Sequence, residues 1–596
     1  MPAHCARTQP MRFPPRSALS LACLTLSTAL SAQTLVRDIH PGPAWSIPAF
    51  PTVVGRTLFF AAETNAAGRE LWKSDGTFDG TSMVADLHPG PGSSALANLT
   101  AMGDNLFFTA WDGVFDVELW TSDGSAGGTH IVADIRPGYP GSTPAELTVL
   151  GSTLFFRAND GTHGAELWKS DGTVAGTVMV ADVRSGGSSN PAHLTPMGGL
   201  VLFSANDGRS GVELWRSDGT MAGTVLVADI NRGDAGSSPT LLTVSAGALF
   251  FRATDALTGV ELWKSDGTAG GTVLVADLAS GPASSNPQML TAVGSSVFFT
   301  ADDGTGKGVE LWKTDGTTMG TVLVADLNPG PASSNPTELT ASGNLLFFSA
   351  TDGVTGFEPW VSDGTAAGTR QVRDIRPGPG SSAPLHLLSA AHNTRILMAA
   401  NDGIRGTELW LSDGSLAGTI PRADLNPGPA GSNPVHFIRM ASVVFFAADD
   451  GLNGQELWAL PLSGFGGALA EPYGMGCAGT GGRTPRLSGT GSPVVGNAGF
   501  AIRLSEGLSQ STAALFLGLD RVAIPLGGGC TAYTLPVSVL FAPTGGTGEA
   551  SFALPIPPIP SLIGIELHAQ SGVFDPAGAY QGLLSFTAGL HVVIGN

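Results

Sequence analysis

A tandem repeat of nearly constant length fills residues 35–460 and constrains the fold more than any other feature of the chain. Its signature is ELWxSDGTxxGTxxVxD, and successive copies lie 47–50 residues apart. Such a constant period indicates one supersecondary unit that is stacked repeatedly, with each copy burying its apolar face against its neighbours. The nine copies are marked by Trp72, Trp120, Trp168, Trp215, Trp263, Trp312, Trp360, Trp410 and Trp458.

The third copy predicts four short strands and no helix. The strands are expected at 147–150, 153–158, 165–170 and 177–183, because β-branched and aromatic residues are concentrated there and turn residues separate them. No segment has the 3.6-residue periodicity of an amphipathic helix. Four antiparallel strands in one repeat are typical of a blade of a β-propeller.

The two ends of the array predict how it closes. The ninth copy stops after Trp458, without the SDGT turn or a fourth strand, whereas residues 35–42 closely match residues 371–378 of a complete copy. The N-terminal segment is therefore expected to supply the missing strand and to remove the exposed edges. We predict an all-β fold: a closed β-propeller of nine four-stranded blades whose N-terminal strand closes the last blade. Propellers usually have four to eight blades, so two smaller rings or an open superhelix remain alternatives.

The residues after the array predict a second all-β module. The propeller is expected over 33–460, a glycine-rich linker over 461–473 and a C-terminal β-sandwich over 474–596. Cys477 and Cys530 are the two cysteines that would remain after export, and they are expected to form one disulfide in this module. A role in sorting or surface attachment is one hypothesis for the module, and a plain accessory sandwich is the other.

Residues 1–32 have the features of a signal peptide. Three arginines precede an apolar run at 18–30, and cleavage is expected after Ser31 or Ala32. The apolar run is too short to span a membrane, so the mature chain is expected to be secreted or displayed at the cell surface, without a transmembrane segment. Cys23 offers a lipid-anchor alternative, although the apolar run continues past it.

The charge of the chain disfavours two classes of partner. Its formal charge is −20, and removal of the three arginines in residues 1–32 brings it to −23. Nucleic acids and anionic lipids bind basic patches, so neither is an expected partner. We expect a monomer with an acidic surface that can attract cations.

The repeat signature resembles that of the ELWxxDGT repeat family of bacterial exported proteins. The matching stretches include residues 166–173 (ELWKSDGT) and 310–317 (ELWKTDGT). Departures are few: Pro359 replaces leucine in the seventh copy, and Ser125 and Ser415 replace threonine. The resemblance implies a propeller-like fold and supplies no catalytic residues.

The signature residues themselves favour structural roles. The aspartate of each SDGT turn, such as Asp171, is expected to accept backbone N–H bonds while the following glycine supplies a positive φ. An ion site is the alternative for these aspartates. The tryptophans are expected to anchor the packing between blades, and the alternative is that they form sugar-binding platforms.

A second set of carboxylates predicts a candidate calcium site. Eight of the nine copies have an aspartate at the start of the loop between the second and third strands and a glutamate six or seven residues later. One face of the ring would then carry the hard oxygen ligands that calcium prefers, and Asx-type turns on an acidic surface are the alternative. The candidate ligands are Asp112, Glu118, Asp160, Glu166, Asp207, Glu213, Asp255, Glu261, Asp303, Glu310, Asp352, Glu358, Asp402, Glu408, Asp450 and Glu456.

The sequence predicts that the chain is not an enzyme. Its histidines are scattered, and neither an HExxH nor a GxSxG motif stands out. Any asymmetric site is expected where the copies diverge, at Trp111 and Phe115, at Tyr139, or at Arg405 with residues 396–398.

The leading functional prediction is a secreted or cell-surface binding or adhesion protein. Its repetitive propeller face would engage an extracellular polysaccharide or a surface protein at several points, so that multivalency supplies avidity. One alternative is a structural extracellular repeat protein without a specific ligand. A lyase or hydrolase that acts on glycans is the other alternative.

Overall fold

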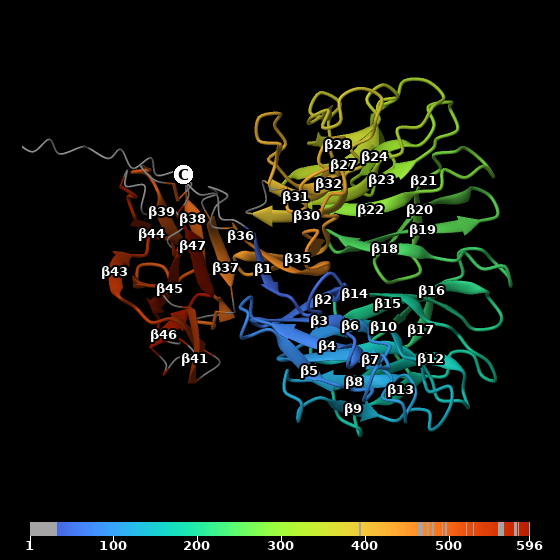
Figure 1. Cartoon of the computed structure of the whole chain (residues 1–596), viewed down its shortest axis with the longest axis horizontal. Coiled ribbons are helices and arrows are strands. Elements are labelled where there is room, and N and C mark those ends of the chain that lie inside the picture. Colours follow the sequence, from blue (N-terminus) through green and yellow to red (C-terminus); the bar gives the residue numbers. More distant parts are fainter. Residues whose placement is uncertain are drawn as a thin grey trace, which may run out of the picture.

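Strands provide the regular structure of the chain in the computed structural model. The structure describes residues 33–391, 395–422, 424–462, 469–473, 476–479, 482–490, 493–494, 497–519, 521–527, 530–557, 566–576, 578, 581 and 583–594. In these residues there is no α-helix, and the repeats form nine separate four-stranded antiparallel sheets. The prediction of an all-β fold is therefore confirmed. Figure 1 shows the sheets following one another in colour order, with the N-terminal β1 beside the late strands β35 and β36.

Each sheet holds four strands that pair in the order first, second, third, fourth. The first strands are β2 (Ala49–Val54), β6 (Ala97–Met102), β10 (Ala145–Leu150), β14 (Ala192–Met197), β18 (Thr240–Ser245), β22 (Gln288–Val293), β26 (Thr337–Ser342), β30 (Leu385–Ala391) and β34 (Val435–Met440). The second strands are β3 (Thr57–Thr64), β7 (Asn105–Ala110), β11 (Thr153–Asn159), β15 (Leu200–Asn206), β19 (Ala248–Asp255), β23 (Ser296–Ala301), β27 (Leu345–Thr351), β31 (Arg395–Asn401) and β35 (Val443–Asp449).

The third and fourth strands complete the sheets. The third strands are β4 (Gly68–Ser74), β8 (Glu118–Ser122), β12 (Ala165–Ser170), β16 (Val212–Ser217), β20 (Gly259–Ser265), β24 (Glu310–Thr314), β28 (Phe357–Ser362), β32 (Thr407–Ser412) and β36 (Gln455–Pro461). The fourth strands are β5 (Ser82–Ala85), β9 (His130–Ala133), β13 (Val178–Ala181), β17 (Val225–Ala228), β21 (Val273–Ala276), β25 (Val322–Ala325), β29 (Arg370–Gln371), β33 (Ile420–Pro421) and, for the last sheet, β1 (Thr34–Arg37).

The four strands expected in the third copy are present as β10–β13, but β13 is shorter than predicted. Its two expected ends bond elsewhere: the hydroxyl of Thr177 lies 2.8 Å from that of Ser170, and the N–H of Val183 donates to Glu166 Oε2 at 3.0 Å. Local turn bonds and the buried carboxylate therefore replace the sheet ladder at both ends of this strand.

The N-terminal strand completes the last sheet, as predicted. β1 pairs with β36 in antiparallel register, with Leu35 opposite Trp458 and Thr34 opposite Ala459. The first strands also contact one another in chain order from β2 to β34, and β34 contacts β2 in turn. The contacts between first strands thus return to the sheet where they began.

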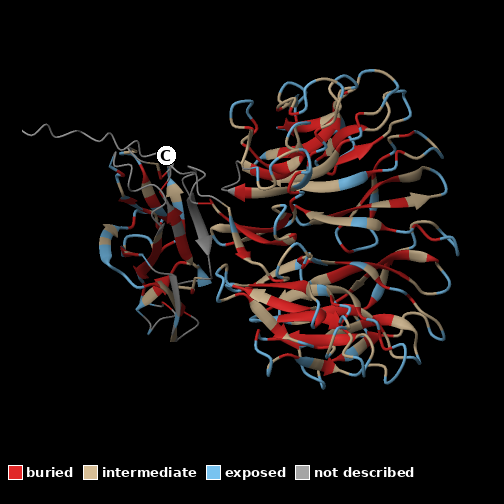
Figure 2. Cartoon of the chain, in the orientation of Figure 1, coloured by how far each residue is buried: buried red, intermediate tan, exposed pale blue. Residues whose placement is uncertain are grey.

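Apolar side chains from adjacent sheets form shared cores. One core contains Phe59 and Leu71 of one sheet together with Phe108 and Trp120 of the next. Figure 2 shows buried residues running along the strands and exposed residues gathered in the loops. Trp120 is only 7% exposed, as expected for a packing anchor between sheets rather than a platform open to sugars.

The SDGT turn has the structural role that its sequence predicts. Asp171 Oδ1 accepts from the N–H of Thr173 at 2.9 Å and from its hydroxyl at 2.7 Å. The Thr173 hydroxyl in turn accepts from the N–H of Gly176 at 3.0 Å. The exposed aspartate therefore serves the turn itself, and its hydrogen bonds with Thr173 lower the pKa of Asp171.

The C-terminal part contains three sheets. A six-stranded sheet joins β37 (Leu469–Tyr473), β40 (Thr512–Gly518), β43 (Ser538–Pro543), β45 (Glu566–Phe574), β46 (Leu584–Phe586) and β47 (Gly589–Val593). A three-stranded sheet joins β38 (Arg486–Thr490), β39 (Ala501–Ser505) and β44 (Ala550–Ala553), and β41 (Arg521–Gly527) pairs with β42 (Cys530–Thr534). The six- and three-stranded sheets share one hydrophobic core, which includes Ile502, Leu515 and Phe552. The expected linker differs from the structure, because β37 lies in it and pairs with β47.

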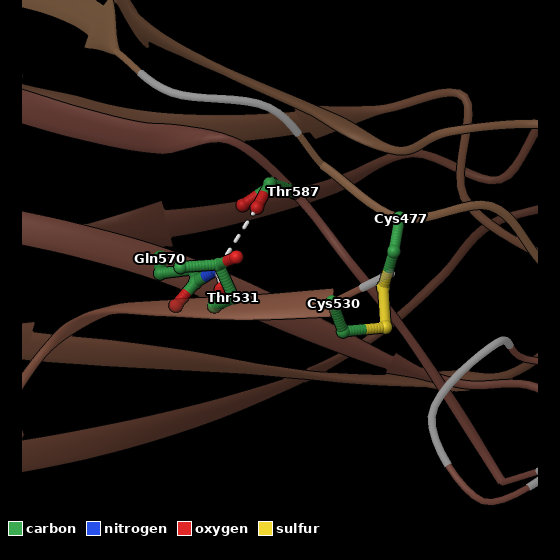
Figure 3. The surroundings of a disulfide bond; sticks show 5 residues. All are labelled: Cys477, Cys530, Thr531, Gln570 and Thr587. Atoms are coloured by element: carbon green, nitrogen blue, oxygen red, sulfur yellow. Dashed lines mark hydrogen bonds between the residues drawn. A yellow bond between two sulfur atoms is a disulfide. The ribbon is translucent and has the colours of Figure 1, made fainter. Parts of the chain in front are cut away.

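The predicted disulfide between Cys477 and Cys530 is present, and Figure 3 shows its surroundings. It joins residues 53 positions apart in the C-terminal part. Nearby, the side chain of Gln570 donates to the carbonyl oxygens of Thr531 and Thr587 at 2.7 and 3.0 Å. The expected signal peptide, residues 1–32, lies outside the described residues. In the described part of the chain, no helix has the length and apolar character of a membrane span.

Candidate active site at the inner rim

Each of the nine first strands carries a β-bulge at the same place. The pairing with the second strand shifts between Ala49 and Thr52 in β2, for example, and between Val435 and Ile438 in β34. One residue in each bulge has a positive φ of 54–61°, which is uncommon for any residue other than glycine. We call these nine residues the inner rim: Phe50, Asn98, Glu146, His193, Leu241, Met289, Glu338, His386 and His436.

The inner rim is the place where similar repeats present different chemistry. Seven of the nine side chains are partly exposed to solvent, and those of Glu146 and Glu338 are more buried. The rim includes three imidazoles, two carboxylates, one amide and three apolar groups, whereas the leucine and threonine that follow recur in most copies. A left-handed backbone at a non-glycine residue costs about 1–2 kcal/mol, and such conformations cluster at functional sites.

Arg69 adds a cation to one segment of this rim. Its Nη2 donates to the carbonyl oxygen of Ile47 at 3.2 Å, and its guanidinium carbon lies 5.8 Å from the centre of the Phe50 ring. Its Nε is buried and has no hydrogen-bond partner among the described residues. The equivalent position in other copies holds valine, alanine, phenylalanine, threonine or glutamine, so this cation occurs in a single repeat. Burial lowers the pKa of Arg69, and the charge of Glu63 opposes that effect.

His386 and His436 lie on the neighbouring first strands β30 and β34, and β34 contacts β2 of the sheet that holds Arg69. The ring of His386 is 6.5 Å from that of Phe437, the residue after His436. Partial burial, followed by the positive charges of His386 and Arg69, lowers the pKa of His436 below its usual 6.5. The neutral imidazole of His436 can therefore accept a proton near neutral pH. We call His386, His436 and Arg69 the basic corner of the rim.

Glutamates on the rim bind the strands beside them. Glu146 Oε2 accepts from the N–H of His193 at 2.8 Å, and Glu338 Oε2 accepts from the N–H of Leu387 at 3.3 Å. These bonds link each carboxylate to the next first strand and fix the spacing of the rim. The inner rim thus places carboxylates and imidazoles on adjacent sheets.

The glutamates of the predicted carboxylate ring point into the protein and hold its own loops. The glutamate of each ELW motif is fully or almost fully buried. Glu358 is representative: its Oε1 accepts from the N–H of Ser382 at 2.8 Å, and its Oε2 accepts from the N–H of Ile375 and the Ser382 hydroxyl. Each glutamate therefore holds the loop that leads to the next sheet. Burial, opposed by these hydrogen bonds, raises the pKa of Glu358 to about 6.

The aspartates that were paired with these glutamates in the calcium prediction form turns. Asp160 Oδ1 accepts from the N–H groups of Thr162 and His163, each at 2.8 Å. The same turn recurs at Asp112, Asp207, Asp255, Asp352, Asp402 and Asp450, with a shorter form at Asp303. The expected Asp–Glu ligand pairs are not formed, because the glutamates turn into the protein and the aspartates bind their own loops. Among the described residues, no three metal-ligating side chains gather, and calcium binding stays a prediction.

Glu70 is the exception among the buried glutamates, and it predicts a pH-dependent stability. Its Oε1 has no partner within the described part of the chain, and burial raises its pKa to about 7 from an ordinary 4.5. Because its pKa is raised in the folded state, protonated Glu70 stabilises the fold fully below pH 4.5. This contribution to the free energy of unfolding, about 3 kcal/mol, is lost as the pH rises through about 7. Glu70→Gln should therefore match the wild type near pH 4.5 and be more stable at pH 8, as measured by urea unfolding.

Glu408→Gln is the matched control for that measurement. Glu408 Oε1 accepts from the N–H of Ser432 at 2.6 Å, so an amide NH₂ at this position would face another donor. This second variant should be destabilised at both pH values. Equal pH dependence in wild type and Glu70→Gln would contradict the assignment to Glu70.

The other positions where an asymmetric site was expected do not join the rim. The ring centres of Trp111 and His88 are 4.5 Å apart, and Tyr139 is 89% exposed. Arg405 forms an ion pair with Asp402 at 3.4 Å. The sequence signal for the rim is the second residue after a proline at the start of eight of the nine copies (Leu96 replaces this proline in the second copy), and that residue differs between most repeats.

Comparison with known proteins gives matches among solved structures. Neither a protein-family model nor a curated protein matches the sequence. Among solved structures, puromycin hydrolase is 17% identical over 61% of this chain and 61% of its own, with a TM-score of 0.33. A structure from a study of two prolyl endopeptidases is 11% identical over 79% and 56%, with a TM-score of 0.35. Prolyl oligopeptidase B from Galerina marginata is 13% identical over 60% and 55%, with a TM-score of 0.33.

These findings correct two predictions. The matched structures are hydrolases and peptidases by name, which contradicts both the prediction of a binding or adhesion protein and the prediction that the chain is not an enzyme. The chain matches only about 55–62% of the length of these structures. At such TM-scores, their activities do not transfer to it.

Proposed function

We propose that this chain is a hydrolase whose active site is the basic corner of the inner rim. The observation that carries the proposal is the imidazole of His436 on the inner rim, whose pKa burial and the charges of His386 and Arg69 lower, together with the buried, unpartnered Nε of Arg69. Both stand where nearly identical repeats differ, and perturbed titratable groups of this kind are concentrated at functional sites.

The chemistry of these groups fits hydrolysis at an ester or amide carbonyl. His436 takes a proton from water as the water oxygen attacks the carbonyl carbon. The guanidinium of Arg69 stabilises the negative charge that forms on the carbonyl oxygen. When the tetrahedral intermediate breaks down, the leaving group departs with the proton from His436. The exposed ring of Phe50 offers an apolar surface for the substrate beside these groups.

The proposal rests on a closed nine-bladed propeller. Support comes from the nine four-stranded sheets, the pairing of β1 with β36 and the contact between β34 and β2. Closure of the ring would bring His436 of the last sheet beside Phe50 and Arg69 of the first. For the C-terminal part we propose a β-sandwich, because its two larger sheets share one core.

Export and family membership complete the proposal. The basic and apolar pattern of residues 1–32 supports secretion or surface display, and the repeat signature supports membership of the ELWxxDGT repeat family. An exported hydrolase would act on substrates outside the cell.

Hydrolysis by the purified chain 33–596 is the test of this proposal. The substrates are p-nitrophenyl esters, aminoacyl p-nitroanilides and a set of polysaccharides, each assayed with and without EDTA. Ester or amide hydrolysis that withstands EDTA supports the proposed chemistry. Cleavage of polysaccharides alone, activity that EDTA abolishes, or no activity toward any substrate would overturn it.

A further inference from the structure

A cavity of about 660 Å³ lies between the sheet β6–β9 and the sheet β10–β13. Its lining includes Thr121, Asp123 and His130 of the first sheet, and Asp171 and Gly172 of the second. The hairpin turns between first and second strands also line it, whereas the inner rim lies at the opposite end of the first strands. The cavity is therefore separate from the basic corner.

At five other sheet boundaries, a cation from the protein fills the equivalent place. Lys73 Nζ donates to the carbonyl oxygen of Gly124 in the next sheet at 2.7 Å, and Lys169 Nζ donates to that of Gly219 at 2.8 Å. Three further boundaries have the same bond, from Arg216 to Gly267, from Lys264 to Gly316 and from Arg370 to Gly414. A charged donor on the carbonyl of the SDGT glycine is thus a recurring part of the packing between sheets.

Thr121 interrupts this pattern, as Ala459 does at the boundary with Gly76. It occupies the position of Lys73 and Lys169, but its hydroxyl is too short to cross the boundary and donates to Leu106 of its own sheet at 3.1 Å. No side chain among the described residues donates to the carbonyl oxygen of Gly172. Without a lysine at this position, the space that its alkyl stem would fill stays open, and the carbonyl oxygen that its ammonium group would contact has no side-chain donor in the described part of the chain.

The surroundings of the gap define its chemistry. In the filled boundaries, the lysine stem runs beside a phenylalanine ring that packs on the turn glycine, as Lys169 and Phe155 do at Gly219. The open boundary keeps that ring, because Phe107 lies against Gly172. The carboxylates of Asp104, Asp123 and Asp171 are close to the same cavity and outnumber its single histidine, His130.

We propose that this cavity binds an alkylammonium group in place of the missing lysine. The ammonium would donate to the carbonyl oxygen of Gly172, and the alkyl chain would lie along Phe107. The neighbouring carboxylates favour the cation over a neutral group of the same shape. Either a free alkylamine or a lysine side chain of a peptide can supply this group.

Ligand-observed NMR with pentylammonium, using the full chain 33–596, tests the proposal. Pentylammonium should bind to the full chain, and the neutral isostere 1-pentanol should bind at least tenfold more weakly. Thr121→Lys supplies the missing side chain and should weaken binding at least tenfold, whereas Thr121→Val should leave it unchanged. Nα-acetyl-lysine amide as a second probe distinguishes the sources: its binding assigns the site to peptide lysine, and its exclusion assigns the site to free amines.

Lys169→Thr provides a test that does not depend on the folding of the Thr121 variants. It should open an equivalent gap at the next boundary, beside the carbonyl oxygen of Gly219, and raise the stoichiometry by one. Equal binding of 1-pentanol, unchanged binding in Thr121→Lys, or an unchanged stoichiometry in Lys169→Thr would overturn the proposal.

Discussion

Replacing Glu456 with alanine is expected to release the N-terminal strand and to destabilise the whole array of sheets. Glu456 accepts from the N–H of Ile39 at 2.9 Å, and from the N–H and hydroxyl of Ser46 at 3.1 and 2.7 Å. These donors are buried, and they lie more than 400 residues away in the sequence. Leaving them without an acceptor should cost about 3–5 kcal/mol. Urea unfolding measures the loss, and limited proteolysis shows whether β1 is released.

Glu213→Ala is the matched control for this change. Glu213 makes the equivalent bonds to Ile230 and Ser237, but these residues lie 17 and 24 positions away in the same part of the chain. Its loss should cost a similar free energy without exposing the N-terminus. Cleavage near residue 37 at equal rates in the two variants would contradict a special role for Glu456 in closing the array.

The second large effect is expected at His436. Replacing it with asparagine keeps a polar side chain but removes the proposed general base, so kcat/KM should fall about 10²–10⁴-fold. The measurement is steady-state hydrolysis of the best substrate found in the screen. Circular dichroism and urea unfolding establish that the variant folds.

His193→Asn is the control for His436→Asn. His193 also lies in a bulge with a positive φ on the inner rim, but it stands on β14, away from Arg69. The substitution should change kcat/KM less than about twofold, since the residue has no proposed role in proton transfer. If both variants lose activity equally, the rim supports structure rather than catalysis at one corner.

Local patterns predicted the strands of the repeats well. The four strands of the third repeat, the turn at Asp171 and the packing of Trp120 each depend on residues close in sequence or on a strict period. Pairing of β1 with β36 was predictable because the last copy lacks a fourth strand and the N-terminus supplies one. The disulfide followed from the presence of two cysteines in the C-terminal part.

The candidate site was not predictable in the same way. The exposure of His436 depends on a bulge, and a bulge is defined by pairing with another strand rather than by the local sequence. The sequence predicts Glu358 as a surface ligand, but its hydrogen-bond donors lie 17 and 24 residues downstream and hold it inside the protein. Arg69 and His436 belong to sheets from the two ends of the array, which meet only because β34 contacts β2.

The pH dependence of kcat/KM tests the account most directly. Partial burial and the positive charges of His386 and Arg69 lower the pKa of His436, so activity should rise with pH along an acidic limb whose midpoint is below 6.5. Arg69→Gln removes one of these charges and should move the midpoint upward. A wild-type profile that is flat from pH 5 to 8, or a midpoint that Arg69→Gln leaves unchanged, would contradict catalysis by His436 in the basic corner.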